Sequence, residues 1–198
     1  MFLSGAISAI LLYAAYATHR RHKKGKSRRY FSGLVIGGGF ALTLTVFTDA
    51  LLYRLTGESF YSLLQNGSYI PTAVFLAGAL QGVVYEYVGS FSLNLWYYPT
   101  VRHKHLLFLL LPLFWAIFMI IMQNTFAIFR AVGLSSSGAF VLTALIPFLL
   151  IEGINIYTKT WVYRGMLKAP LILALGWFVL AYTFALGFNK FILNPFGL

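Results

Sequence analysis

The sequence predicts an all-α, polytopic integral membrane protein, built as a bundle of six transmembrane helices in a single domain over residues 1–198. Three observations predict this class. First, 60% of the residues are hydrophobic and 10% are charged, whereas a soluble domain carries roughly 25% charged residues. Second, six apolar stretches approach the roughly 20 residues that a helix needs to cross a bilayer. Third, the loops between these stretches alternate between rich and poor in Lys and Arg.

The six predicted spans are the stretches 2–18, 30–53, 70–98, 105–129, 138–158 and 169–188. The first is short, and its cationic residues follow the apolar run instead of preceding it, so we expect a retained helix and not a signal peptide. The loop 54–69 is amphipathic and is expected to form a short helix on the membrane surface. The serines 135–137 are expected to cap the fifth span.

The cationic residues predict the orientation of the bundle. Twelve of the fifteen Lys and Arg residues follow the first, third and fifth stretches, and three lie on the other side. The positive-inside rule then places both termini on the non-cytoplasmic side of a multi-pass protein of the cell membrane. The basic loops are expected to contact anionic lipid headgroups. Because the chain has no separate basic domain, we expect no binding of nucleic acid.

Glu86 is the most informative residue of the third stretch. Gly78, Gly82, Glu86, Ser90 and Asn94 recur every four positions, so on a helix they share one face. Small residues allow a neighbouring helix to approach closely. An ionised carboxylate at mid-membrane costs about 2.5–3.5 kcal/mol on insertion scales. This face is therefore expected to point into the bundle.

Glu152 is expected at a similar depth, on a helix that runs in the same direction. Asn155 and Lys159 follow it on roughly the same helical face. If the third and fifth helices are neighbours, the two glutamates can face one cavity between them and share a proton. The alternative is structural, with Glu86 bonded to a neighbouring helix and Glu152 paired with Lys159 or with a backbone group.

A weak internal repeat relates the third and fourth stretches to the fifth and sixth. In each half a glutamate is followed by a Trp-x-Tyr group, then by a proline and a second tryptophan. The residues are Glu86, Trp96, Tyr98, Pro112 and Trp115, then Glu152, Trp161, Tyr163, Pro170 and Trp177. Parallel copies of one hairpin are common in transporter folds. The sequence therefore allows a hairpin duplication.

The remaining polar and aromatic residues have simpler interpretations. The aromatic groups at 96–98 and 161–163 suit an interfacial belt, with stacking on a ligand as the alternative. Asp49 is expected to form a salt bridge with Arg54, and the glycines 37–39 to permit a close helix contact. The intramembrane amides Gln81, Asn94, Gln123 and Asn124 are expected to join helices.

No metal site and no cofactor are expected. The chain has no cysteine, and its four histidines lie at the predicted cytoplasmic edge, far from the acids. Signatures of phosphoryl transfer, metalloprotease and serine hydrolase chemistry are absent, which leaves open whether the protein is an enzyme. The order of glutamate, glycine and Trp-Tyr resembles isoprenoid-modifying membrane enzymes in outline. This resemblance assigns no role to any individual residue of the chain.

The sequence thus predicts a membrane protein that binds or transports a small or amphipathic ligand, with glutamates that handle a proton or the polar group of the ligand. An intramembrane enzyme that acts on a lipid or isoprenoid by acid–base chemistry is one alternative, with Glu86 or Glu152 as the general acid. An accessory subunit of a larger membrane complex is the other. The expected ligand-binding residues are Glu86, Glu152, Asn94, Asn155, Trp96 and Trp161.

Overall fold

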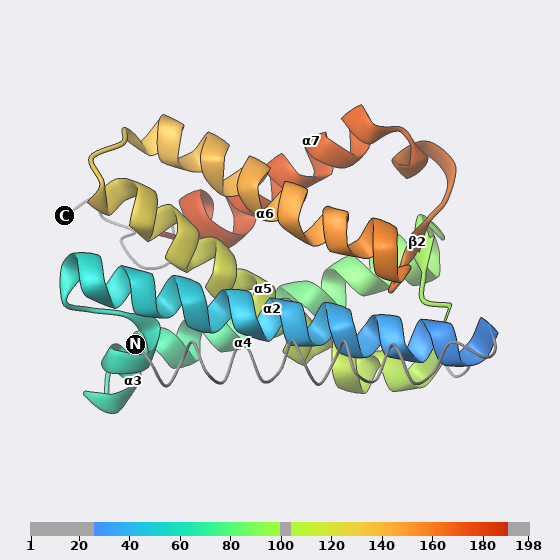
Figure 1. Ribbon diagram of the computed structural model, residues 1–198, viewed down its shortest axis with the longest axis horizontal. Helices are drawn as coiled ribbons and strands as arrows, with labels where there is room; N and C mark the ends of the chain where they lie inside the picture. The colour runs from blue at the N-terminus through green and yellow to red at the C-terminus, as the bar shows by residue number, and fades with distance from the viewer. Residues whose placement is uncertain (1–25, 100–103, 190–198) are drawn as a thin grey trace.

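The computed structural model describes residues 26–99 and 104–189, and over them the fold is all-α apart from one pair of very short strands. The long helices run along the longest axis of the molecule (Figure 1). The α-helices are α2 (Lys26–Thr56), α3 (Phe60–Gln65), α4 (Ile70–Tyr85), α5 (Lys104–Ala131), α6 (Ser136–Thr158) and α7 (Pro170–Ala181). The other elements are the π-helices η1 (Glu86–Ser92) and η3 (Tyr182–Leu186), the 3₁₀-helix η2 (Gly165–Lys168), and the strands β1 (Trp96–Tyr97) and β2 (Val162–Tyr163).

Among the residues that the structure describes, three helices are long and apolar enough to cross a membrane: Ile70–Ser92, Leu111–Ala131 and Ser136–Thr158. They match the predicted third, fourth and fifth spans. The segment Pro170–Leu186 is a shorter apolar helix, and α2 covers the predicted second span. The predicted first span, 2–18, lies outside the described residues. The count of six spans and their orientation remain predictions.

The third span ends earlier than expected. The helix stops at Ser92 and not near Tyr98, because Asn94 takes a left-handed backbone conformation with φ +50°. This conformation is unfavourable inside a right-handed helix for any L-residue. The chain therefore turns away from the helix axis, and the following residues run as the extended strand β1.

Helix α5 forms the centre of the bundle, in contact with α2, α4 and α6. The predicted small-residue face of α4 packs on it. A Cβ placed on Gly82 would lie 2.3 Å from Trp115 Cβ, and one on Gly78 would lie 2.8 Å from Met119 Cβ. Since real Cβ atoms do not approach so closely, only glycine permits this spacing of the two helices. The prediction of an inward face is confirmed from Gly78 to Ser90.

Several local expectations are also confirmed. The loop 54–69 contains the short helix α3, whose capping box joins Ser59 and Ser62, and Ser135 caps α6. A Cβ on Gly37 would lie 2.9 Å from Thr160 Oγ1, whereas Gly38 has open space. Asp49 accepts hydrogen bonds from Ser59 Oγ at 2.9 Å and from Tyr61 N at 3.3 Å, which ties α2 to α3. The salt bridge between Asp49 and Arg54 stays a prediction.

Two of the predicted intramembrane amides join helices as expected. Gln123 Nε2 donates to the carbonyl of Phe184 at 2.8 Å, and Asn124 Nδ2 donates to Thr48 Oγ1 at 3.4 Å. These bonds link α5 to η3 and to α2. Such interhelical bonds are worth about 0.6 kcal/mol each in membranes. They therefore contribute more to the register of the helices than to the stability of the bundle.

The strands connect the two predicted hairpins at one end of the molecule, whereas α3 and the turn between α5 and α6 lie at the other (Figure 1). They pair antiparallel, with Trp96 opposite Tyr163 and Tyr97 opposite Val162. The bond from Arg164 N to the carbonyl of Leu95, at 2.6 Å, extends this pairing. The end of α4–η1 and the end of α6 are thereby held at a common level.

Candidate functional site

Glu86 is the first residue of η1 and is 1% exposed. Its carboxyl accepts three hydrogen bonds: from Tyr98 Oη at 2.5 Å, from Trp115 Nε1 at 3.0 Å and from Trp96 Nε1 at 3.2 Å. Two of these donors reach it because the chain turns back after Ser92, and the third comes from α5. The early end of the helix is thus what brings the aromatic donors to the carboxyl.

Glu152 lies on α6 and is 5% exposed. It also accepts three hydrogen bonds: from Tyr163 Oη at 2.5 Å, from Trp177 Nε1 at 3.1 Å and from Asn155 Nδ2 at 3.3 Å. Each glutamate thus receives a tyrosine from a neighbouring strand segment and a tryptophan from the following helix. The correspondence noticed in the sequence recurs as two similar hydrogen-bond clusters, which differ in the third donor, Trp96 for Glu86 and Asn155 for Glu152.

The donors of both clusters are suited to a carboxylate. An indole N–H can donate but cannot accept, so the tryptophans have no favourable arrangement other than facing an acceptor. Tyr98 and Tyr163 lie outside the apolar spans, and burial, followed by the adjacent glutamates, raises the pKa of both hydroxyls well above the ordinary value of 10.0. These tyrosines therefore remain protonated donors at any physiological pH.

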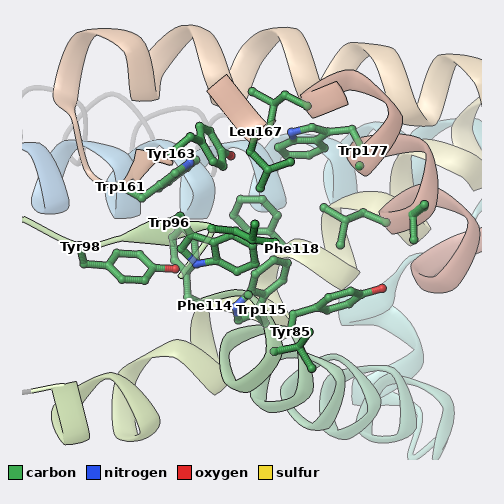
Figure 2. Close-up of a pocket in the computed structure, with 17 residues that line it drawn as sticks. Tyr85, Trp96, Tyr98, Phe114, Trp115, Phe118, Trp161, Tyr163, Leu167 and Trp177 are labelled. Carbon is green, nitrogen blue, oxygen red and sulfur yellow. The ribbon is translucent and has the colours of Figure 1, made fainter. Parts of the chain in front are cut away.

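A cavity of about 290 Å³ lies between the two clusters. Figure 2 shows the rings of the second hairpin, among them Trp161, Tyr163 and Trp177, on one side and those of the first hairpin on the other. The wall consists of side chains from α4, η1, α5, α7 and the segments around both strands, and all four tryptophans of the chain belong to it. Among the described residues, α6 contributes none. The cavity is thus framed by the third, fourth and sixth stretches, and not by the third and fifth as expected.

Neither glutamate lines the cavity, but five of their six donor residues do. The indole and phenol rings form the wall, and their N–H and O–H groups bond to the carboxyls behind it. The lining is therefore almost wholly apolar although two acids lie just behind it. The two clusters are close enough to interact, since Glu86 contributes to the raised pKa of Tyr163.

The predicted site residues fall into three groups. Trp96 and Trp161 line the cavity, and their interpretation as a membrane-interface belt stays a prediction. Asn155 lies behind it, where Nδ2 donates to Glu152 and Oδ1 accepts from Trp161 N at 3.1 Å. Asn94 is exposed and stands apart from the cavity lining, with its Oδ1 accepting from Arg164 Nη1 at 2.7 Å.

The sequence-based site omitted several residues that complete the wall. Tyr85 stacks on Trp115 with ring centroids 5.4 Å apart, and its hydroxyl bonds to Thr183 Oγ1 at 2.9 Å. Phe118 lies between Trp115 and Trp177, with centroids 5.7 and 5.9 Å away. Trp115 and Trp177 occupy matching positions of the sequence repeat, and this match could have predicted that both belong to the site. Phe118 carries no comparable signal, since phenylalanine is common throughout the chain.

Both π-helices border this region. Val88 and Gly89 of η1 line the cavity, and Phe184 of η3 packs edge-on against Trp115 with centroids 6.0 Å apart. The π-turn is rare and is frequently found at functional sites. Of these two turns, η1 continues α4 and η3 continues α7.

Comparison with known protein families, with curated proteins and with solved structures finds no protein to which this chain is significantly similar. Within residues 26–99 and 104–189, no group of three His, Asp or Glu side chains is placed to hold a metal ion. The geometry of the cavity and its two clusters is therefore the basis for a functional assignment.

Proposed function

We propose that this protein is a multi-pass membrane protein that binds, and carries across the membrane, a small and largely apolar ligand in the aromatic cavity. The observation that carries the proposal is a cavity of about 290 Å³ that all four tryptophans line together with tyrosine and phenylalanine rings. Binding pockets are concave and mostly apolar, with a few placed polar groups. The carboxyl clusters supply those polar groups.

The ends of the helices support a membrane orientation of this bundle. The cationic residues Lys159, Arg164 and Lys168 lie near the strand end of the molecule, where α2 also begins with Lys26 (Figure 1). Arg54 and Arg130 lie at the opposite end. This asymmetry favours six spans with the strand end in the cytoplasm. The two equivalent clusters favour a duplicated hairpin, an architecture that transporters use to form a central site.

Intramembrane catalysis is the second candidate, and one observation favours it. The hydroxyls of Tyr98 and Tyr163 each bond to a buried carboxyl, and both tyrosines line the cavity. When Glu86 carries a proton, it can donate that proton to Tyr98 while Tyr98 donates its own to a ligand. The accessory-subunit alternative predicts that there is no cavity, so the cavity argues against it.

Filling the cavity tests the proposal. Gly176 lines it, and a Cβ there meets nothing within 4 Å, so Gly176→Phe should occupy the ligand space without displacing the fold. Gly153 on α6 is exposed and equally uncrowded, which makes Gly153→Phe the matched control. We expect native mass spectrometry to detect a bound apolar compound on the wild type and the control, and at least about ten-fold less on Gly176→Phe.

Equal occupancy in all three proteins would contradict the cavity as the binding site. The same spectra separate transport from catalysis. A carrier releases the compound unchanged, whereas an enzyme yields a second compound of related mass when the purified protein is incubated with membrane lipid extract. Only the enzyme reading predicts that Tyr98→Phe and Tyr163→Phe abolish this conversion while the first compound remains bound.

A further inference from the structure

We infer that the ligand of the aromatic cavity is a lipophilic organic cation, such as a quaternary ammonium compound. The inference rests on the proposed function and narrows its ligand class. It is drawn from the juxtaposition of two carboxyls, each of which accepts three hydrogen bonds, with a wall of nine aromatic rings.

The hydrogen bonds favour the charged form of each carboxyl. At Glu86, two of the three donors are indole N–H groups, which cannot accept a hydrogen bond from a neutral carboxyl, whereas the hydroxyl of Tyr98 can. At Glu152, Trp177 is such a donor, and the amide of Asn155 has a fixed orientation because its Oδ1 already accepts from Trp161 N. Its Nδ2 must therefore point toward Glu152 as a donor. Three donors on one carboxyl are the arrangement expected around a carboxylate.

No protein cation balances these charges within the described part of the chain. Every hydrogen-bond partner of Glu86 and Glu152 there is an uncharged tyrosine, tryptophan or asparagine. Arg164 is exposed, and its Cζ lies 4.2 Å from the centroid of the Tyr97 ring. Its Nη1 donates to Asn94 Oδ1. Buried charges are ordinarily paired. A cationic ligand would supply the missing countercharge.

The wall is suited to the same charge. The aromatic residues that line the cavity are Tyr85, Trp96, Tyr98, Phe114, Trp115, Phe118, Trp161, Tyr163 and Trp177. The face of an aromatic ring is negative, and tryptophan attracts cations best. The carboxylate of Glu86 behind Trp96, Tyr98 and Trp115 adds to this field, and that of Glu152 does so behind Tyr163 and Trp177. An anionic ligand would be repelled by the ring faces and by the carboxylates. A neutral ligand would leave the carboxylates without a countercharge.

Two probes of one shape test the charge. Phenyltrimethylammonium and tert-butylbenzene differ by the exchange of nitrogen for carbon, so they match in size and differ in charge. Binding is measured by titration calorimetry on the full chain in nanodiscs, with empty nanodiscs subtracted. We expect the cation to bind the wild type at least about ten-fold more tightly than its neutral counterpart.

The double variant Glu86→Gln/Glu152→Gln should bring the two affinities to within about two-fold, and Glu58→Gln, at an exposed acid, should leave the preference unchanged. Equal binding of both probes to the wild type would overturn the inference and leave the apolar cavity as a binding site. A preference that persists in the folded double variant would also overturn it. Failure of both probes to bind would contradict the proposed function itself. If the double variant does not fold, the wild-type ratio decides.

Discussion

At the scale of single residues, glycine determines where the aromatic donors can lie. A Cβ on Gly89 would lie 1.8 Å from Trp96 Cη2, so the indole occupies the space that a side chain would take. Gly82 plays the same part for Trp115, with 2.3 Å between the hypothetical Cβ and Trp115 Cβ. Both tryptophans donate to Glu86. The two glycines are therefore part of the binding geometry of that carboxyl, although neither has a side chain.

We predict that Gly89→Ala displaces Trp96 and breaks its bond to Glu86. Overpacking of this kind costs about 1–3 kcal/mol, and the lost bond leaves a buried carboxyl with one donor fewer. Thermal unfolding of the detergent-solubilised protein should therefore shift to lower temperature. Gly153→Ala is the control, since its Cβ meets open space and alanine favours a helix by roughly 0.5–1 kcal/mol. A Gly89→Ala protein as stable as the control would contradict the assignment.

At the scale of elements, the strand pair β1–β2 holds the two tyrosine donors in place. Tyr163 belongs to β2, and Tyr98 directly follows β1. Burial raises the pKa of both hydroxyls above 10.0, chiefly by desolvation and secondarily through the adjacent glutamates. In the unfolded chain these tyrosines lose their protons at a lower pH than in the folded protein. Their stabilising contribution is therefore complete below about pH 10 and is lost as the pH rises beyond it.

We predict that stability falls more steeply with pH in the wild type than in Tyr98→Phe/Tyr163→Phe once the pH exceeds about 10. Each tyrosine contributes a slope of about 1.4 kcal/mol per pH unit in this range. Thermal unfolding between about pH 9 and pH 11 would measure the two slopes. Absolute stability is expected to differ between the proteins, so the comparison is of slopes. Parallel curves would show that the hydroxyls titrate as in the unfolded chain.

The elements also show how far the sequence could predict the site. Four-residue spacing placed Glu86 on the packed face of α4–η1, because helical periodicity alone determines that face. It could not place Trp96 or Tyr98, since their position depends on the left-handed turn at Asn94. A Trp-Tyr group at the end of an apolar stretch is equally typical of a membrane-interface belt. Strands of two residues leave no periodic signal, so the pairing that joins the hairpins was not predictable.

At the scale of the whole molecule, the two hairpins meet around one cavity and carry equivalent clusters. Helix α5 packs against both α4 and α6, so it separates the two glutamate-bearing helices. The sequence predicted that both glutamates face inward, but it also predicted that their side chains line a shared cavity. The aromatic donors stand between each carboxyl and that space, an arrangement that depends on tertiary packing of side chains from four helices.

We predict that the two ends of this bundle face opposite sides of the membrane. The chain has no cysteine, so single cysteines can report sidedness without background. Met166→Cys lies in η2 at the strand end, and Ser137→Cys lies at the start of α6 at the other end; both positions are exposed. An impermeant maleimide should label Ser137→Cys in intact cells, and Met166→Cys only after permeabilisation. Labelling of both in intact cells would contradict the predicted orientation.

The gathering of every tryptophan around one space has a practical consequence. All four indoles of the chain line the cavity, so essentially the whole intrinsic emission of the protein originates there. A molecule that enters among these rings should quench or shift that emission in proportion to occupancy. The protein thus contains its own optical reporter, which would allow candidate compounds to be screened on unlabelled, unaltered chains.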